Sequence, residues 1–471
     1  MLKPAAVAII ALFAGACAVG PDYQRPAVDT PASWRLTEPA ARDLANTPWW
    51  LQFDDPVLAA LIDEALRANK DLLIASARVD EYAGRYGFVR AQLFPQVGFG
   101  ADARRQRDIG AVVIGAGNST VFDSYSTVLN ASWEIDFWGR IRRETEAARA
   151  QLMASEEARR GVVLSLVGSV AGAYVNLRDL DRQLEIAQAT AKARGESYEI
   201  FKLRYEGGII SLLELSQNRS QYEEALATIP ALEKAVVQQE NGLSFLLGRN
   251  PGPITRGKTI DELVLPGIPA GLPSELLERR PDIRQAEQNL VAANALIGAA
   301  KAQYYPSISL TGLFGYSSTS LSSLFDSQSK VWQFAGALKM PIFTAGAIAG
   351  QVEAAEATQQ QALFAYQKAI QQGFREVNDA LIDQDRTKVQ LQAQKRQVAA
   401  LEEYATIARL RYENGYTSFI EVLDAERSLF NAQLQYTQSQ QVEFQAMINL
   451  YKAMGGGWVV EADKLTVGDS R

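Results

Sequence analysis

Two long stretches of the chain carry apolar and small residues at every third or fourth position. They run from Gly139 to Tyr205 and from Gly346 to Tyr412, and neither contains a proline. This spacing is typical of a helix with one buried stripe. At 1.5 Å per residue each helix would be about 100 Å long, whereas an ordinary globular helix has about 11–12 residues. Any interpretation of the chain must therefore account for two very long helices.

Elsewhere the apolar positions alternate with a period of two, which is typical of a strand with one apolar and one mostly polar face. The clearest example is 125–135, where Tyr125, Leu129 and Trp133 alternate with serine, asparagine and acidic residues. The pattern predicts two β-hairpins, at 96–136 and 306–341, and the Gly-rich segment 110–119 is the expected loop of the first. Each strand has about ten residues or more, and a transmembrane strand needs about 9–11.

The same order of elements occurs twice, which indicates an internal duplication. The segment from Arg204 to Gly208 is matched 207 residues later by the segment from Arg411 to Gly415. We expect a first repeat at 56–248, a Pro- and Gly-rich linker at 249–272, a second repeat at 273–454 and a C-terminal tail at 455–471. Besides the hairpins, the expected elements are shorter helices, long helices at 139–205 and 346–413, and return helices at 209–248 and 417–454.

The N-terminus has the features of a secretory signal. Lys3 precedes an apolar run from Ala5 to Phe13, and three small residues then lead to Cys17, the one cysteine of the chain. Residues 1–16 are therefore predicted to be a signal peptide. Cleavage just before Cys17 would allow lipid attachment to it; alternatively, Cys17 leaves with the signal. Residues 17–55 are rich in proline and are expected to form an extended, lipid-anchored segment outside any core. No other stretch approaches 18 apolar residues, so we expect no membrane-spanning helix.

Composition removes several classes of function. The 471 residues include no histidine, which excludes Ser-His-Asp triads and histidine-ligated zinc. The net charge of −7 argues against nucleic acid as a partner. We find no phosphate-binding loop, metal cluster or activated nucleophile, so we expect no catalytic residues, no cofactor, no metal and no enzymatic activity.

The hairpins raise the question of what meets their apolar faces. In one alternative, helices of the same chain cover a four-stranded sheet. In the other, the apolar face meets lipid, but open sheet edges cannot lie in a bilayer because their backbone groups would lack partners. Four strands cannot close around water, so several chains would have to share one barrel, and three chains would give twelve strands. The long helices could likewise form a helical tube or an antiparallel coiled coil, and their periodicity fits both.

Several motifs resemble the TolC-like outer-membrane efflux channels, and in particular their OprM/NodT-type lipoprotein branch. The resemblance spans nearly the whole mature chain. The residues that carry it are Cys17-Ala18-Val19-Gly20-Pro21-Asp22-Tyr23, Trp49-Trp50, Phe53, Asp55-Pro56, Leu58, Leu61-Ile62, Ala65-Leu66, Asn69, Asp71-Leu72, Glu278-Arg279-Arg280-Pro281-Asp282-Ile283 and Leu423-Asp424-Ala425-Glu426-Arg427.

This resemblance implies a mainly α-helical, internally duplicated chain with a membrane β-barrel part. In the family, a homotrimer forms a twelve-stranded β-barrel in the outer membrane of a Gram-negative bacterium. A mixed equatorial region and a twelve-helix α-barrel extend the barrel into the periplasm. The implied partners are outer-membrane lipid, a periplasmic adaptor (membrane fusion) protein and a proton-driven inner-membrane pump of the RND type.

The resemblance also assigns roles to individual residues. Asp424 and Ile420 would line the closed periplasmic gate, and Tyr412 would belong to the contacts that hold it shut. The tips of the helix pairs would dock the adaptor, at Arg204, Gly208, Arg411 and Gly415. The first-half counterpart of the Asp424 motif, Leu215-Ser216-Gln217-Asn218-Arg219, lacks the aspartate. An acidic ring should therefore come from the second repeat alone. We expect Gly208 and Gly415 to end their helices in a left-handed conformation.

The function expected from these features is a passive conduit that exports small toxic compounds such as drugs, solvents or metal ions, with energy supplied by the partner pump. One alternative is a channel of the same shape in a one-step protein-secretion system. Another, from a different class, is a periplasmic coiled-coil scaffold without a pore.

Overall fold

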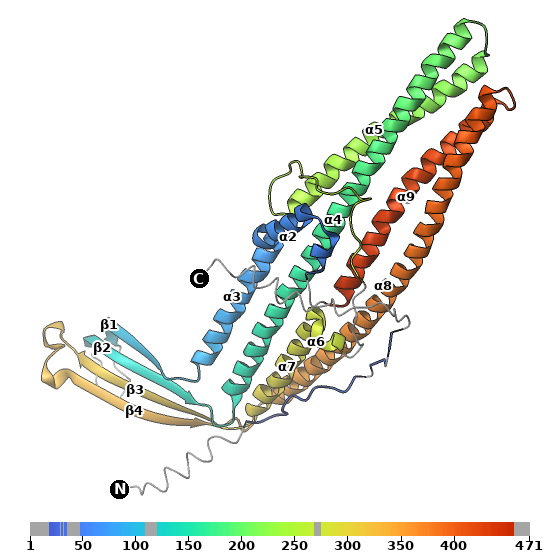
Figure 1. The fold of residues 1–471 in the computed structure, drawn as a ribbon. Coiled ribbons are helices and arrows are strands. Elements are labelled where there is room, and N and C mark those ends of the chain that lie inside the picture. Colours follow the sequence, from blue (N-terminus) through green and yellow to red (C-terminus); the bar gives the residue numbers. More distant parts are fainter. Residues whose placement is uncertain are drawn as a thin grey trace. The chain divides into compact units, whose positions relative to one another are not determined.

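A computed structural model describes residues 18–28, 30–31, 33–34, 48–108, 120–267 and 275–455. The predicted signal peptide, Cys17, the loop 109–119 and the tail beyond 455 lie outside the described residues. In chain order the described elements are η1 (Trp49–Phe53), α2 (Pro56–Ala68), α3 (Lys70–Ala91), β1 (Gln96–Asp108), β2 (Thr120–Ile135), α4 (Arg140–Glu206), α5 (Leu212–Leu246), α6 (Leu276–Arg279), α7 (Pro281–Ala302), β3 (Ser307–Ser318), η3 (Leu321–Ser323), η4 (Ser327–Ser329), β4 (Lys330–Lys339), α8 (Ala347–Glu413) and α9 (Phe419–Ala453) (Figure 1).

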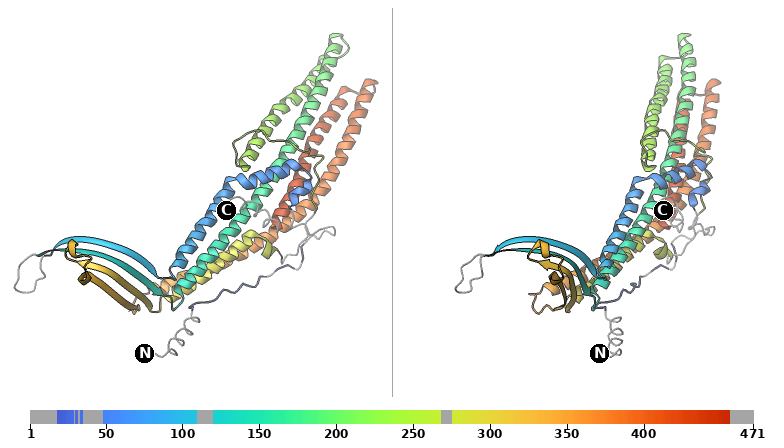
Figure 2. Two further views of the ribbon diagram at one scale, coloured as in Figure 1. Left: turned by 60° about the vertical axis from the view of Figure 1, so that its left-hand side comes forward. Right: turned by 90° about the vertical axis from the view of Figure 1, so that its left-hand side faces the viewer.

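The second half of the chain repeats the helices of the first. Helices α3 and α7 have 22 residues each, α4 and α8 have 67 each, and α5 and α9 have 35 each. In all views α4 and α5 run antiparallel as one pair, and α8 and α9 as another (Figure 2). The long helices, return helices and strands all lie close to the ranges that the sequence predicts.

The chain divides into two compact units that do not coincide with the two repeats. Unit 1 contains Met1–Ala27, Arg78–Glu156 and Gln285–Gln367, and unit 2 contains Val28–Ala77, Glu157–Arg284 and Lys368–Arg471. Each unit thus takes segments from both repeats, because neither repeat builds a complete sheet or helical core by itself.

Unit 1 contains a curved antiparallel sheet whose described strands lie in the order β1-β2-β3-β4 (Figure 2). The register aligns Phe99 with Leu129, Leu129 with Phe314, and Phe314 with Trp332. Because side chains alternate between the faces of a sheet, these four side chains share one face. Ser132, which the register aligns with both Gln96 and Thr311, lies on the opposite, polar face.

The apolar face of the sheet is not covered by the described part of the chain. Phe99 and Phe334 are 71% and 78% exposed, and Trp332 is 68% exposed. The first alternative, in which helices of the same chain cover this face, is therefore wrong for the described residues. Large aromatic side chains left open to this extent mark a surface that meets lipid or another protein.

Unit 2 has an aromatic core that the sequence analysis placed outside any core. Residues 17–55 were expected to be extended throughout, but 49–53 form the short helix η1, and Trp49, Trp50 and Phe53 are buried. Trp49 stacks on Tyr451 of α9 with ring centroids 5.2 Å apart. The prediction was wrong because it rested on the proline content of the whole range. The three aromatic side chains of 49–53 bury a large apolar surface, which places this segment in the core.

Asp55 joins three parts of unit 2 through one carboxylate, which is 3% exposed. Its Oδ1 accepts from the backbone N–H of Val57 at 2.8 Å and so caps the first turn of α2. Its Oδ2 accepts from the Tyr174 hydroxyl of α4 at 2.7 Å and from the Lys258 N–H of the linker at 3.0 Å. Burial and the Asp55 carboxylate raise the pKa of Tyr174 well above its ordinary value, which keeps the hydroxyl a donor.

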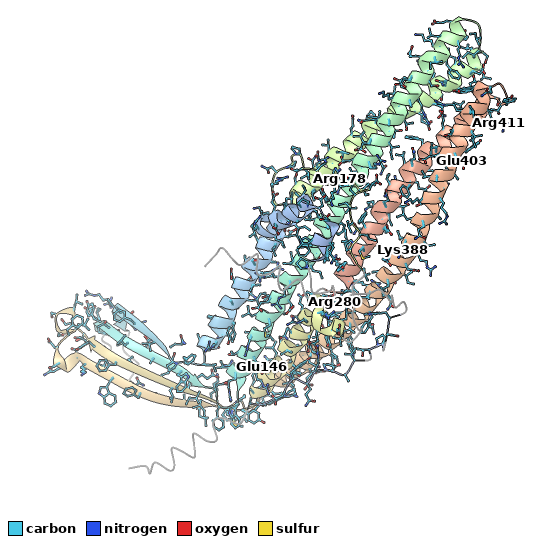
Figure 3. The ribbon with its side chains drawn as sticks, in the orientation of Figure 1. Glu146, Arg178, Arg280, Lys388, Glu403 and Arg411 are labelled. Atoms are coloured by element: carbon cyan, nitrogen blue, oxygen red, sulfur yellow. The ribbon has the colours of Figure 1, made fainter. Side chains whose placement is uncertain are left out.

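In each repeat a polar side chain donates a hydrogen bond to the last carbonyl of the return helix, but the residue type differs between the repeats. The side chain of Asn69 donates to the carbonyl of Leu246, the last residue of α5, at 2.8 Å. Arg280, labelled in Figure 3, donates to the carbonyl of Ala453, the last residue of α9, at 2.9 Å. Each side chain satisfies a helix-terminal carbonyl that has no partner within its own helix. The duplication therefore preserves this contact although the residue type has changed.

Within the described residues, one helix, α4, contains an 18-residue window apolar enough to cross a membrane by length and composition. No membrane-spanning helix beyond the signal was expected from the sequence. In this window 61% of the residues are buried inside the protein, and the α4 side chains Val163, Val170 and Tyr174 are fully buried. We assign its hydropathy to packing between helices.

The Asp55 contacts predict that Tyr174→Phe destabilises the protein. The substitution removes the hydroxyl that donates to Asp55 and that accepts from the Gly257 N–H at 2.9 Å. Leaving a buried carboxylate oxygen and a buried N–H short of a partner costs about 1–3 kcal/mol, which a lowered thermal unfolding midpoint in detergent would report. Tyr205→Phe, at an exposed position of the same helix, is the control and should leave the midpoint unchanged. Equal midpoints for Tyr174→Phe and wild type would contradict this role.

Candidate functional site

The two helix tips have the same backbone geometry. Gly208 and Gly415 have φ of +73° and +76°, as the sequence predicts. The N–H of Ile209 donates to the carbonyl of Arg204 at 2.8 Å, and the N–H of Tyr416 donates to that of Arg411 at 2.9 Å. This bond, together with one from each glycine N–H, forms a Schellman motif that ends a helix. Arg204, Gly208, Arg411 and Gly415 thus lie together at the turns, and Figure 3 labels Arg411 at the end of α8.

An aromatic cluster joins the two helix pairs near these turns. Phe201 of α4 lies 4.3 Å from Phe419 of α9 and 6.2 Å from Tyr412 of α8, measured between ring centroids. Phe201 and Phe419 are each 5% exposed, and Ala408 and Val422 complete the buried cluster. Tyr412 therefore helps to hold α8 and α9 against α4.

The Tyr412 hydroxyl lies among charges from the first repeat. Burial and the nearby Glu214 carboxylate raise its pKa, while the Arg204 guanidinium beside it acts in the opposite direction. Arg204 also lies 5.9 Å above the Phe201 ring. Glu214 itself completes a capping box with Ser211 at the start of α5. The two tips are thus connected by both ring stacking and electrostatics.

Ile420 and Asp424 lie on a different side of α9 from the aromatic cluster. They line a cavity of about 420 Å³, which α5 completes with Gln217, Ser220 and Gln221. Ile420 is 55% exposed. The structure therefore does not bring the three predicted gate residues into one contact: Tyr412 belongs to the aromatic cluster, whereas Ile420 and Asp424 border the space between α5 and α9.

Asp424 has a basic partner that the sequence analysis did not assign. Arg427, one helical turn further along α9, places its Nη2 2.9 Å from Asp424 Oδ1, and both side chains are more than half exposed. The i, i+3 spacing of an acid and a base was the available signal. The motif position of the first repeat carries Ser216 instead, so the charged pair comes from the second repeat only.

The return helix α5 is tied to α4 by buried polar contacts beside this cavity. Arg194, 5% exposed, donates to the carbonyl of Gln221 at 2.8 Å, and Asn218 donates to Ser197 at 3.0 Å. Burial lowers the pKa of Arg194, and the Glu224 and Glu426 carboxylates act in the opposite direction. Sequence reasoning missed both contacts, because each joins residues that are more than twenty positions apart.

The described part of the N-terminal segment forms a strap along helices of unit 1. The N–H of Val19 donates to the carbonyl of Trp138 at 3.0 Å, next to the junction of β2 and α4. Further along, Asp22 pairs with Arg143 at 2.6 Å, and Arg25 pairs with Glu287 at 2.9 Å. Residues 18–27 therefore have fixed contacts although they form no helix or strand.

The strap approaches α7 too closely for any side chain to intervene. A Cβ added to Gly298 would lie 2.5 Å from the Val19 carbonyl oxygen, and one added to Gly20 would lie 2.3 Å from the Gly298 Cα. Ala18 in turn lies against Gly139, where an added Cβ would meet the Ala18 Cα at 2.8 Å. The structure thus places the residue after Cys17 at the junction between strand β2 and helix α4; Cys17 itself lies outside the described residues.

Among the described residues, no group of three or more His, Cys, Asp and Glu side chains is arranged to hold a metal ion. The features that the structure does gather are the helix tips, the aromatic cluster, the cavity between α5 and α9, the exposed apolar sheet face and the strap.

The chain is similar to known proteins over nearly its whole length. A family model described as outer membrane efflux protein matches residues 61–249 and 272–456. The toluene efflux pump outer membrane protein TtgC of Pseudomonas putida is 37% identical over 460 residues, covering 96% of this chain and 95% of TtgC. The cation efflux system protein CusC of Escherichia coli is 38% identical over 458 residues, covering 95% and 97%.

A third relative and a solved structure extend this comparison. The protein named probable outer membrane lipoprotein SilC, of Salmonella typhimurium, is 37% identical over 466 residues, covering 97% of this chain and 99% of SilC. A crystal structure of CusC, described in connection with transmembrane channel formation, superposes with a TM-score of 0.85 at 37% identity. That superposition covers 93% of this chain and all of that one.

The glycine contact predicts that Gly298→Leu displaces the strap. The side chain would occupy the space of the Val19 carbonyl, so amide hydrogens of residues 18–28 should exchange with deuterium faster, by about tenfold or more for an opening cost of over about 1.4 kcal/mol. Gly350→Leu is the matched control, because a Cβ at this α8 position would meet nothing within 4 Å. Unchanged exchange in Gly298→Leu would show that the strap does not depend on this approach.

Proposed function

Because this chain belongs to the outer membrane efflux protein family, we propose that it is the outer-membrane channel of a tripartite efflux system. The family resemblance expected from the sequence motifs is thereby confirmed. The family consists of outer-membrane transport proteins rather than enzymes. The proposed channel is a passive, trimeric conduit, and the observation that supports it best is the exposed apolar face of a sheet whose edges need partners.

The sheet cannot enter a bilayer as a single copy. Among the described strands, β1 and β4 each pair on one side only, and an unpaired edge in lipid leaves N–H and C=O groups without hydrogen bonds. With four strands from each chain, β4 of one copy runs antiparallel to β1 of the next, so copies can continue the same ladder. Three copies would close a twelve-stranded barrel, an even number as in bacterial outer-membrane barrels. Its apolar face would meet lipid and its polar face water.

The long helices would continue this conduit into the periplasm. Each chain supplies α4, α5, α8 and α9, so three chains would supply the twelve helices of a tube. Ala- and Gln-rich helix surfaces permit close packing and a wet interior. A coiled-coil scaffold without a pore would fit the helix periodicity as well. It would not explain why the aromatic face of the sheet is exposed.

Lipid attachment at Cys17 would anchor the chain in the outer membrane. Two observations support it: the strap fixes Ala18 at the junction of β2 and α4, and SilC is named a probable lipoprotein. An acyl chain on Cys17 would therefore start close to the end of the proposed membrane strands. Because Cys17 directly precedes Ala18, the contacts of the strap would also position the lipid anchor.

The gate is proposed at the tips. Asp424 and Ile420 of three copies would surround the axis, and the aromatic cluster containing Tyr412 would keep the helix pairs together. Since Arg194 and Asn218 tie α5 to α4, opening would move α9 relative to α5 across the cavity between them. An adaptor that docks at the tips would bias this movement, and an inner-membrane RND-type pump would supply the energy.

The cargo is proposed to be small toxic compounds. TtgC is named for toluene efflux and CusC for cation efflux, so organic solvents and metal ions are both within the range of similar proteins. A role in one-step protein secretion is supported by no observation on this chain.

The first test of this function is pore formation. The purified mature protein, extracted with detergent, should migrate as a trimer without heating and as a monomer after heating. It should give discrete single-channel currents in planar bilayers. A detergent-independent soluble monomer without channel activity would overturn the proposal, because the sheet would then have no membrane to meet.

The second test concerns the gate. Asp424→Ala, alone or with Tyr412→Phe, should raise single-channel conductance and lower the preference for cations. It removes an acidic ring and leaves the three Arg427 side chains without their partners. Because an exposed ion pair contributes about 0.2–1 kcal/mol, we expect a change of about 1.5- to 5-fold.

Arg427→Gln is the matched variant for the gate test. It retains the carboxylate without its partner, so cation preference should rise instead of falling. If neither substitution alters conductance or ion selectivity, Asp424 does not line the constriction and the gate assignment is incorrect.

A further inference from the structure

A seam of small residues joins α4 and α7. It contains four alanines that are at most 4% exposed: Ala147 and Ala150 of α4, and Ala292 and Ala295 of α7. The seam continues to Gly298 of α7, where an added Cβ would lie 2.9 Å from Cγ of Arg143. Further along, Arg284 of α7 pairs with Glu157 of α4 at 2.9 Å. The α4 numbers rise along the seam while the α7 numbers fall, so the two helices are antiparallel.

The order of the strands accounts for this seam. Helix α4 follows β2 and α7 leads into β3, and β2 pairs with β3. Helix α3 leads into β1 and α8 follows β4, at the two edges of the described sheet (Figure 1). The strand order β1-β2-β3-β4 therefore makes α3 and α8 the outer members of the row α3-α4-α7-α8.

The internal duplication supplies a second version of both sides of this seam. Helix α4 begins at Arg140 and α8 at Ala347, so matching positions differ by 207. Helix α3 begins at Lys70 and α7 at Pro281, so matching positions differ by 211. The positions on α8 that match Arg143, Ala147 and Ala150 are Gly350, Ala354 and Ala357. The positions on α3 that match Ala295 and Gly298 are Gly84 and Gly87.

These matching positions are open, whereas the alanines of the internal seam are buried. Gly84, Gly87 and Gly350 have no described atom within 4 Å of an added Cβ, and Ala354 and Ala357 are exposed. On each helix they recur at intervals of three or four residues, so they form one stripe. Both halves of a close-packed seam are therefore present, but on the two outer helices of the row.

Two large apolar side chains extend the open stripes. Leu73 of α3 and Phe364 of α8 match Arg284 and Glu157, the ion pair of the internal seam. They are 48% and 62% exposed. An ion pair tolerates water, but a leucine and a phenylalanine gain by leaving it. The stripes on α3 and α8 are thus complementary to each other and need a cover.

The charged residues beside the stripes have polar partners within reach. Glu81 of α3 pairs with Arg85 of the same helix at 2.5 Å. If α8 and α3 used the register of the internal seam, Glu353 of α8 would lie at the height of Arg85. Asp80, which matches the partly buried Val291 of the internal seam, would lie one turn from Gln361, whose amide can donate to it. A contact between these stripes would therefore not isolate a charge.

From this equivalence we propose that α8 of one copy packs antiparallel against α3 of a second copy, in the register that α4 and α7 use within the chain. Gly350 would lie opposite Gly87, and Phe364 opposite Leu73. The contact rests on the proposed trimer and names the helical surface through which its copies meet. Pairing of β4 with β1 of the next copy would bring α8 beside α3, just as pairing of β2 with β3 brings α4 beside α7.

The two kinds of seam would differ in what covers them. The strap crosses the internal seam at Gly298, where an added Cβ would lie 2.5 Å from the Val19 carbonyl oxygen. The matching Gly87 has no described atom over it. Direct packing of α8 on α3 would therefore hold neighbouring copies together, whereas the strap adds to the packing of α4 on α7.

The first test is disulfide cross-linking of the purified protein in detergent. The variant Gly84→Cys/Ala354→Cys places thiols at the positions that match Ala295 and Ala147, which pack in one cluster. Oxidation should convert the chains into covalent dimers and trimers on a denaturing gel. A bond within one chain is excluded, because no described atom lies within 4 Å of a Cβ at Gly84. Cys17 does not interfere, since its thiol is either acylated or removed with the signal peptide.

The control for cross-linking is Gly84→Cys/Ala365→Cys. Ala365 is exposed and lies on the same side of α8, three helical turns or about 16 Å beyond Ala354. A disulfide needs Cα atoms within about 7 Å, so this pair should remain monomeric on the gel. If both pairs cross-link equally, or if neither does, α8 and α3 do not meet in the proposed register.

The second test is a double-mutant cycle on the two apolar side chains. Leu73→Ala and Phe364→Ala should each speed subunit exchange between differently tagged trimers by about tenfold, a typical effect of truncating a well-packed interface residue. The double variant should exchange little faster than either single variant, because each substitution already removes the same contact. Phe364→Leu retains an apolar side chain and should have a smaller effect. If the two single effects multiply in the double variant, Leu73 and Phe364 do not touch.

Channel recording separates this inference from the proposed function. Reduced Gly84→Cys/Ala354→Cys should form pores with the conductance of wild type, which also shows that the variant folds and assembles. Normal pores without cross-linking would overturn the contact between α8 and α3 and leave the channel intact. Absence of pores and of trimers in wild type would instead overturn the channel, and this contact with it.

Discussion

The structure depends on the need to satisfy the backbone groups at the two edges of its sheet. Within the described residues, β1 and β4 pair on one side only, and one face of the sheet is apolar and exposed. In water such a sheet would expose aromatic side chains, and in lipid it would leave its edges unpaired. Pairing between copies removes both costs at once. The proposed trimer is therefore a consequence of the sheet's composition and edges.

The internal duplication gives the chain two sets of long helices of equal length, and the two sets have diverged at individual positions. Asn69 and Arg280 each donate to the last carbonyl of a return helix, α5 and α9 respectively, so this divergence preserves the hydrogen bond. Ser216 and Asp424 differ in charge at corresponding positions, and the cavity between α5 and α9 has its Asp424–Arg427 ion pair on the α9 side. A duplicated chain can thus keep its packing fixed while one repeat acquires an additional charged side chain.

The contacts at the tips separate two tasks that the family resemblance grouped together. Stacking of Phe201, Tyr412 and Phe419 holds the helix pairs to one another. Ile420 and Asp424 line the cavity between α5 and α9. Close packing and open space therefore lie on different sides of the same helix.

The sequence by itself determined the period of each element, the duplication, the glycine-ended helix tips and the alternating apolar face of the sheet. These follow from local rules: 3.6 residues per helical turn, two per strand repeat, and the φ that glycine permits. Tertiary structure alone decided that Trp49 and Phe53 are core residues. It also decided that the Tyr174 hydroxyl and the Lys258 N–H both donate to Asp55, and that Tyr412 and Asp424 lie in separate environments. Those contacts join residues distant in sequence, and no local period encodes which side chains meet.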